Sequence, residues 1–385
     1  MVDVLGSQRD LFDVPDDVAY FNAASLSPML HAVREAGDAA LRRRARPWTI
    51  READWFTDVE RLRSLLGALL GADAEGVALV PATSYGFAVA AGVLGAERPR
   101  QVLVLAEEYP SGIYTWRRMV QRHGGGVTTV TREAGQTWTD AVIAAIDERV
   151  DIVSVPNVHW TDGGLVELDR VAARAREAGA RLVVDASQSL GVMPLDVAAL
   201  RPDFVVSVGY KWLLGPFGRG YLWAAAEHRD GRPLEENWIV RADSDDFAGL
   251  VDYRDEYLPG ARRYDQGART LFELTPMAIA ALEQIHAWTP ARIAATLAGI
   301  TADVAARVTA AGAGITATEP RGPHLLGLRV PGGATDRAAA ALRQAGCYVA
   351  RRGDALRVSP HLHVTPADVD RLVGTLAAAV RPPSG

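Results

Sequence analysis

Short, largely apolar runs alternate with amphipathic segments through the first two thirds of the chain. The runs predict buried strands at 77–80, 101–105, 127–130, 151–155, 181–184, 204–206 and 220–223. Between them, apolar residues recur at helical spacing and predict helices at 87–94, 113–122, 139–146 and 168–178. This alternation indicates an α/β fold with a mainly parallel sheet covered by helices on both faces. Ligands of such sheets bind beyond the carboxyl ends of the strands.

The segments before and after this pattern differ from it. Residues 20–28 indicate a short strand that runs into a loop of small residues, and two helices are expected at 31–46 and 54–70. Residues 227–268 are charged and show no period, which is typical of a crossover or an active-site loop region. A long helix is expected from about Pro276 to Trp288.

The last part of the chain predicts a small α+β unit. Its expected helices are 291–311, 336–344 and 366–380, and its expected strands are 324–330, 347–350 and 355–358. Thr335 is the expected N-cap of the second of these helices. With 385 residues, the chain is long enough for two domains. We therefore predict an N-terminal arm at 1–20, a large domain at 21–275, and a bridging helix with a small C-terminal domain at 276–385.

Composition excludes several classes of protein. Hydrophobic residues make up 49% and charged residues 23%, as in ordinary globular proteins. The formal net charge of -6 disfavours binding to a nucleic-acid backbone. Cys347 is the single cysteine, so we expect no disulfide scaffold and a cytoplasmic location. No signal peptide and no membrane span are expected either.

Polar and aromatic residues follow the first two predicted strands of the sheet. Thr83 and Ser84 begin a helix, where free backbone amides and the helix dipole favour a phosphate, although helix capping explains them equally well. Tyr109 follows the strand 101–105, where its ring could stack on a flat ligand or simply pack in the core.

Two later strands end in groups that suit an aldehyde cofactor. Asp185 ends the strand 181–184 and could pair with a protonated ring nitrogen, with Gln188 three residues beyond it; capping of the next turn is the plainer role for Asp185. Lys211 follows the strand 204–206 in an apolar, glycine-rich setting that lowers the pKa of an amine, although an isolated loop lysine is commonly solvated. Such an amine can form a Schiff base. A phosphate cradle, a stacking ring, an acid and an amine together match pyridoxal 5'-phosphate.

These residues carry a family resemblance. The stretches 20–24, 184–188, 207–211 and 357–361, with the Asp-x-x-Gln and Ser-x-x-Tyr-Lys patterns, resemble the class V aminotransferase family, which includes cysteine desulfurases, kynureninases and isopenicillin N epimerases. The resemblance covers most of the chain. It implies the type I fold of pyridoxal-phosphate enzymes, in which a large domain is joined to a small C-terminal α+β domain.

The resemblance also implies roles for individual residues. Lys211 is the Schiff-base lysine, Asp185 the partner of the ring nitrogen, and Tyr109 the residue over the ring. Gln188 and Asn157 lie on the side of the phenolic oxygen. The implied phosphate ligands are Thr83, Ser84, Ser207 and Tyr210, with Arg269 or Thr270 offered from a second subunit. The implied substrate-binding residues are Asn22, Ala23, His159, Trp160 and Arg357, the last of which clamps a carboxylate.

Three features depart from the family pattern or add to it. Cys347 lies in an apparent strand, so persulfide chemistry at this thiol is doubtful. The stretch 267–270 replaces a Gly-Thr-Pro type motif, so the contact across the subunit interface shifts to Arg269 or Thr270, or is lost. His361 and His363 are spaced to share one face of a strand. A metal pair is conceivable there, but we expect structural roles and no metal.

We therefore expect an enzyme that acts on an amino acid through an external aldimine and a Cα carbanion. Aminotransferase or β-eliminating (C–S type) lyase chemistry is favoured, and an epimerase or racemase of the isopenicillin N epimerase type is the alternative. A catalytically silent binding protein that keeps the fold is a further alternative. A dehydrogenase is disfavoured because no Gly-x-Gly-x-x-Gly follows the first strand. The resemblance implies a homodimer with its sites at the interface; no nucleic-acid or membrane partner is expected.

Overall fold

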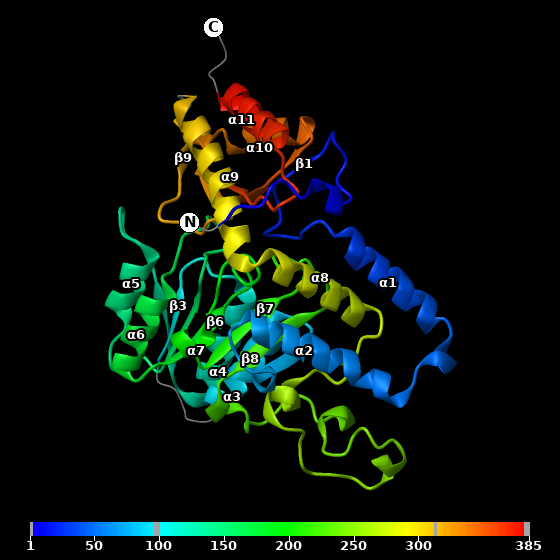
Figure 1. Cartoon of the computed structure of the whole chain (residues 1–385). Helices are drawn as coiled ribbons and strands as arrows, with labels where there is room; N and C mark the ends of the chain where they lie inside the picture. The colour runs from blue at the N-terminus through cyan, green and yellow to red at the C-terminus, as the bar shows by residue number, and fades with distance from the viewer. Residues whose placement is uncertain (1–2, 96–100, 312–313, 381–385) are drawn as a thin grey trace.

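The computed structural model describes residues 3–95, 101–311 and 314–380. At its centre lies a seven-stranded sheet in the order β2-β8-β7-β6-β5-β3-β4 (Figure 1). Neighbouring strands pair in parallel except at β8, which is antiparallel to both β2 and β7. The strands are β2 (Val77–Val80), β3 (Gln101–Leu105), β4 (Gly126–Val130), β5 (Ile152–Pro156), β6 (Arg181–Asp185), β7 (Phe204–Val208) and β8 (Gly220–Ala224). The prediction of a mainly parallel sheet is confirmed.

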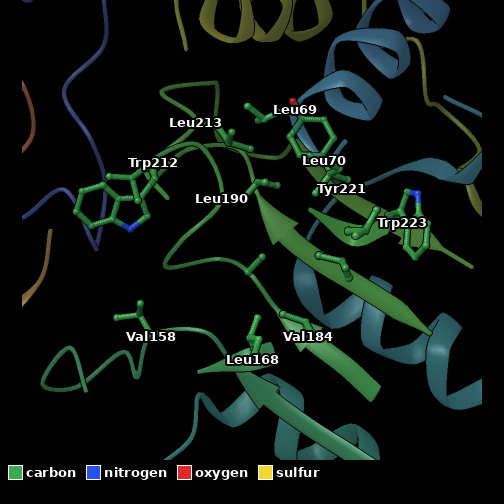
Figure 2. Packing of buried hydrophobic residues seen from close by; sticks show 14 of the residues in the cluster. Leu69, Leu70, Val158, Leu168, Val184, Leu190, Trp212, Leu213, Tyr221 and Trp223 are labelled. Carbon is green, nitrogen blue, oxygen red and sulfur yellow. The ribbon is translucent and has the colours of Figure 1, made fainter. Parts of the chain in front are cut away.

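Helices cover both faces of this sheet because successive side chains of each strand point to opposite sides. Leu103, Val153 and Val184 belong to one core, and Val102, Ile152 and Val183 belong to the other. The first core is covered by α2 (Thr57–Leu69), α5 (Trp138–Ala145), α6 (Leu168–Ala178) and α8 (Leu274–Trp288), and the second by α3 (Thr83–Leu94) and α4 (Pro110–His123). Figure 2 shows part of the first core, with Val184 below Leu190 and Tyr221.

A second, smaller sheet forms the C-terminal region. Its order is β12-β13-β10-β9, all antiparallel, from β9 (Thr316–Ala317), β10 (Leu326–Arg329), β12 (Ala350–Arg352) and β13 (Ala355–Val358). It shares a core with α9 (Pro290–Ala310), α10 (Thr335–Gln344) and α11 (Pro366–Val380). In Figure 1, α9 continues upward from the end of α8 and so links the two sheets.

Among the described residues, α9 is the one helix whose length and apolar composition would allow it to cross a membrane. Its Val304 and Val308 lie in the C-terminal core, and its Arg307 pairs with Asp370 of α11 on the outside. One face of α9 therefore packs in the C-terminal core.

The N-terminal segment packs on the C-terminal region, and its Phe12 also joins the first core beside the large sheet. β1 (Ala19–Tyr20) pairs in parallel with β11 (Cys347–Tyr348), and Phe21 lies in the C-terminal core. Arg9 forms an ion pair with Asp368 at 2.7 Å. The chain then passes beside β13 before it enters α1 (His31–Arg44). The division into residues 1–20, 21–275 and 276–385 stays a prediction.

Short helical turns connect these elements. They are α7 (Val197–Leu200) and the 3-10 helices η1 (Arg9–Leu11), η2 (Pro47–Thr49), η3 (Glu52–Trp55), η4 (Ala74–Gly76), η6 (Ala226–His228), η7 (Trp238–Val240), η8 (Ala248–Val251), η9 (Gly260–Tyr264) and η10 (Pro331–Gly333). Four of them lie in or at the start of the segment 227–268, which is otherwise irregular, as its lack of a period predicted.

Two local predictions are wrong. Thr335 is not an N-cap: it is the first residue of α10, and its hydroxyl donates to the carbonyl of Asp354 at 3.0 Å. The strand predicted at 347–350 is two strands, because β11 pairs with β1 whereas β12 pairs with β13. In both cases a partner distant in sequence decides the local structure.

A buried ion cluster ties the irregular segment to the large sheet. Asp265 is 0% exposed and accepts two hydrogen bonds from Arg63 of α2, one from Arg269 and one from the backbone amide of Leu79 in β2. Burial alone would raise the pKa of Asp265, but Arg63 and Arg269 together hold it below its usual value.

We predict that Asp265→Asn lowers the free energy of unfolding by about 3–5 kcal/mol, because it leaves two buried guanidiniums without their carboxylate. Chemical denaturation monitored by circular dichroism measures the change. Glu283→Gln, which removes an exposed partner of Arg61, is the matched control and should change it by less than about 1 kcal/mol. Equal effects of the two substitutions would contradict the assignment.

Candidate active site

The register of three parallel strands brings several predicted site residues to one edge of the sheet. Pro156 at the end of β5 is paired with Asp185 at the end of β6, and Asp185 is paired with Val206 of β7. Strands that pair in parallel end at the same edge, so the loops that follow them meet there. The loop after β7 carries Lys211.

A cavity of about 210 Å³ lies at this edge. Its walls come from the loops after four strands and from the start of α3. Eight of the predicted site residues line it: Thr83, Ser84, Tyr109, Trp160, Asp185, Gln188, Tyr210 and Lys211. The tertiary structure therefore assembles a pocket from distant residues. Thr83 and Lys211, for example, are 128 positions apart in the sequence.

Lys211 and Asp185 are a pair of opposite charges at this cavity. Lys211 is 9% exposed, and burial lowers the pKa of its amine to about 8 against the opposing effect of Asp185. Burial likewise raises the pKa of Asp185, although its carboxylate accepts a 2.8 Å hydrogen bond from the Ser187 amide. The amine is thus partly unprotonated near neutral pH.

The cavity also contains the start of α3. Thr83 and Ser84 are its first two residues, where backbone N–H groups have no partner within the helix. The helix dipole adds a partial positive charge at the same point. These groups offer donors to an anion such as a phosphate.

Aromatic rings form the rest of the wall. The Lys211 Nζ atom lies 5.6 Å from the centre of the Tyr109 ring and 6.0 Å from that of Tyr210. Trp160 meets the Tyr109 ring edge to face at 5.5 Å, and Tyr210 lies 4.7 Å from the Phe217 ring. A flat ligand at Lys211 would therefore lie among aromatic faces.

Gln188 lines the cavity, but its side chain is already held at both ends. Its amide nitrogen donates to the Ala24 carbonyl at 3.1 Å, and its oxygen accepts from the Trp212 indole at 2.9 Å. Trp212 directly follows Lys211 and packs edge to face on His324. Gln188 thereby fixes the loop that carries the lysine; in Figure 2, Trp212 projects from that loop away from the sheet.

Several predicted site residues lie outside this cavity. Asn157 donates from its side chain to the Val166 carbonyl at 3.0 Å, and the Ser207 hydroxyl lies 3.3 Å from the Val208 carbonyl. His159 is buried against Trp138, and its two ring nitrogens contact the Ala106 carbonyl and the Thr161 hydroxyl. Burial lowers the pKa of His159, so the ring is neutral and Nε2 is the donor to Ala106.

The residues proposed to cross a subunit interface make their contacts within the chain. Arg269 is bound to Asp265, and the Thr270 hydroxyl donates to the Trp55 carbonyl at 2.9 Å. Neither lines the cavity that contains Lys211.

The loop 22–25 and Arg357 form a second group of predicted substrate-binding residues. Arg357 donates to the Trp160 carbonyl at 2.7 Å and to the Ser25 hydroxyl at 2.6 Å, and it lies 3.4 Å from the side-chain oxygen of Asn22. The Ala23 amide is bound to the Ser359 carbonyl. Burial, aided by Arg352, lowers the pKa of Arg357 to about 9.

The two histidines near the C-terminus do not share a strand face, and the predicted strand spacing is wrong. They lie in a turn after β13, where His363 donates to the Tyr20 carbonyl at 2.8 Å and His361 stacks on Trp212. Both rings also contact Phe12. They join the N-terminal segment to the loop that carries Lys211, in keeping with the structural roles predicted for them.

Sequence reasoning missed Glu108, which lines the cavity beside Tyr109. One carboxylate oxygen accepts from the Tyr109 amide at 2.7 Å, and the other is buried without a hydrogen-bond partner. Burial, followed by repulsion from Asp185, raises the pKa of Glu108 to about 8. Its position directly after a buried strand was the signal that could have identified it. Ser187, two residues after β6, carried the same signal and was also overlooked, whereas Arg352 had no such signal.

We predict that the Lys211 amine reacts with trinitrobenzenesulfonate with a midpoint near pH 8, because burial disfavours its ammonium form. Asp185→Asn should move the midpoint to lower pH, since it removes the carboxylate that stabilises the charged amine. Peptide mapping of the modified lysine at a series of pH values measures both. A midpoint near that of free lysine, or a shift to higher pH in the variant, would contradict the assignment.

Comparison with known proteins places this site in a family. The aminotransferase class-V family model matches residues 23–237, more than half of the chain. The isopenicillin N epimerase of Streptomyces clavuligerus is 28% identical over 340 residues, which cover 82% of this chain and 83% of that protein. The kynureninase of Deinococcus radiodurans is 27% identical over 289 residues, 71% of this chain and 67% of the relative.

Solved structures show the same fold. A mutant of C-DES with glycine linked covalently to its pyridoxal-phosphate cofactor superposes with a TM-score of 0.86 at 17% identity, covering 96% of this chain and 99% of the other. The cysteine desulfurase of Thermococcus onnurineus superposes with a TM-score of 0.83 at 19% identity, covering 98% and 99%. The fold predicted from the sequence, that of type I pyridoxal-phosphate enzymes, is confirmed.

The residues at the cavity fit pyridoxal phosphate. The start of α3 suits its phosphate, Asp185 suits a protonated ring nitrogen, and Lys211 suits its aldehyde. Burial raises the pKa of Asp185 against the opposing effects of Ser187 and Lys211, and a protonated ring nitrogen would add a second cation that favours its ionised form. Pyridoxal phosphate, the cofactor predicted from the sequence, is also the cofactor of the family and of the similar solved structures. This chain belongs to the aminotransferase class-V family of pyridoxal-phosphate enzymes.

Proposed function

We propose that the protein is a pyridoxal-phosphate enzyme that acts on an amino acid by aminotransferase or β-eliminating lyase chemistry. The observation that carries this proposal is the Lys211 amine, which lies in the cavity at the strand ends with its pKa lowered to about 8, opposite the buried Asp185. A structural lysine would gain nothing from such desolvation, whereas a nucleophile or base needs it.

Each of three cavity residues would have its own role in the reaction. When bound, pyridoxal phosphate supplies an electron sink for bonds at the substrate Cα. Asp185 would hold a proton at the ring nitrogen, and Tyr109 would cover the ring. The Nζ atom of Lys211 would accept the Cα proton, since much of the amine is neutral near pH 8.

Arg357 would bind the α-carboxylate of the substrate. Its planar guanidinium suits two parallel hydrogen bonds to a carboxylate. No carboxylate pairs with it among the described residues; its hydrogen bonds go to Ser25, Asn22 and a backbone carbonyl. An incoming carboxylate would replace these neutral acceptors with a charged one.

Persulfide chemistry on a cysteine of the chain is not part of the proposal. Cys347 is 1% exposed in β11, and burial raises the pKa of its thiol to about 11. A thiol in this state is a packing residue and a poor nucleophile. A lyase reaction would therefore expel a group from the substrate without transfer to Cys347.

An epimerase is the second candidate. It is favoured by the similarity to the isopenicillin N epimerase of Streptomyces clavuligerus over most of both chains. In this reaction the Cα proton would return to the opposite face. The expectations of a homodimer and of a cytoplasmic location accompany either candidate as proposals.

We predict that pyridoxal phosphate added to the purified protein becomes covalently attached to Lys211, because the neutral amine condenses with the aldehyde. Borohydride reduction followed by peptide mass spectrometry locates the attachment. Lys211→Ala should abolish it, and Asp185→Asn should retain it with altered absorption. A catalytically silent binding protein would show no attachment and no difference between the wild type and Lys211→Ala; that result would refute the enzyme proposal.

We also predict that the loaded enzyme releases the Cα proton of its substrate. Incubation with a panel of amino acids in D₂O, scored for keto acid, ammonia with sulfide, and inversion at Cα, separates the three reactions. Arg357→Gln should reduce kcat/KM by about 10- to 100-fold, the loss expected for a charge-assisted hydrogen bond. Exchange with inversion and without keto acid or ammonia would favour the epimerase.

A further inference from the structure

A second, larger cavity adjoins the one that contains Lys211. Its volume is about 630 Å³, and Glu108 and Trp160 line both cavities. The larger cavity lies against the hairpin that joins β12 to β13, which supplies Arg352 and Asp354. A substrate bound at Lys211 could thus extend its side chain past Trp160 into this space.

Three guanidiniums line the larger cavity, and only two of them are paired with acids. Arg132 pairs with Asp162 at 2.9 Å, and Arg329 pairs with Asp354 at 2.8 Å. Arg352 has no carboxylate partner among the described residues. Its hydrogen bonds go to the Arg351 carbonyl at 2.7 Å and the Ser25 hydroxyl at 3.4 Å, and its buried Nε has no partner.

Arg352 lies next to Arg357, and the same two residues contact both. The Ser25 hydroxyl accepts from both guanidiniums. Trp160 receives a hydrogen bond from Arg357 at its carbonyl, and the Arg352 guanidinium lies 5.2 Å from the centre of its ring. Two cations are therefore held side by side: Arg352 lines the larger cavity, and the buried Arg357 lies behind Ser25 and Trp160 without lining either cavity.

The two neighbouring guanidiniums repel each other unless an anion binds between or beside them. Burial lowers the pKa of Arg352, and repulsion from Arg352 contributes to the lowered pKa of Arg357. Like charges that share no acid repel each other, and one carboxylate can relieve only part of that repulsion. A substrate with two anionic groups would satisfy both guanidiniums.

We propose that Arg352 binds an anionic group at the end of the substrate side chain, so that the substrate is an amino acid with a second carboxylate. This inference rests on the proposed function, in which Arg357 holds the α-carboxylate. Arg352 is then a specificity-determining residue, and Trp160 is the platform that fixes its guanidinium over the cavity.

The acids near the cavity do not oppose this assignment. Glu107 is exposed to solvent at the rim, and its carboxylate is screened there. Glu108 has its pKa raised to about 8 by burial and by Asp185, so it is largely neutral at pH 7. Asp162 and Asp354 are neutralised by their arginines.

Binding of unreactive acids to the cofactor-loaded enzyme tests the proposal without catalysis. Calorimetry would give Kd for the dicarboxylates succinate, glutarate and adipate and for the monocarboxylates butyrate, valerate and hexanoate of the same chain lengths. We expect the wild type to prefer a dicarboxylate by about 10- to 100-fold at the best length. Arg352→Gln should abolish this preference while monocarboxylate affinity is kept, and Arg352→Lys should restore part of it.

Arg329→Gln is the matched control, because Arg329 lines the same cavity but is paired with Asp354; it should keep the preference. Equal affinity for dicarboxylates and monocarboxylates in the wild type would overturn the proposal. So would an equal loss for both in Arg352→Gln, since Arg352 would then serve the same carboxylate as Arg357. Failure of Lys211 to take up pyridoxal phosphate would refute the proposed function separately, because attachment of the cofactor is scored by peptide mapping before any acid is added.

Discussion

The register between β5, β6 and β7 is the constraint on which the site depends. Because these strands pair in parallel and end together, the residues after them converge at one edge, where contacts such as that between Gln188 and Trp212 join the loops. A shift of one residue in β6 would turn Asp185 from the cavity to the opposite face of the sheet. The apolar alternation that sets this register fills both cores, so the site is positioned by the same packing that stabilises the domain.

Buried charges occur in two contrasting settings in this protein, one fully paired and one sparsely paired. At Asp265 the carboxylate is matched by Arg63 and Arg269, and the cluster fastens an irregular segment to the sheet. At the cavity, charges are buried with few partners: burial lowers the pKa of Lys211 and raises that of Asp185. The first arrangement stabilises the fold. The second leaves reactive groups whose missing partners a cofactor and a substrate supply.

The C-terminal region contacts the N-terminal segment and the loop that carries Lys211 through residues far apart in sequence. β1 joins β11, and the loop that follows β1 brings Ser25 to Arg352 and Arg357. On the other side, His361 packs on Trp212 beside Lys211. The N-terminal segment therefore links Arg352 and Arg357 of the C-terminal region to the large-sheet loop at Gln188, whose side chain donates to the Ala24 carbonyl.

The sequence by itself determined the alternation of strands and helices, the parallel sheet and the residues at the strand ends, because periodicity and position relative to a buried strand are local properties. Lys211, Asp185, Tyr109 and the start of α3 followed from them. The tertiary structure decided what depends on distant partners. It held His159 and Ser207 outside the cavity, made Thr335 a helical residue, split the strand at 347–350, and brought Arg352 beside Arg357. No local pattern encodes these outcomes, since each is set by which segment packs against which.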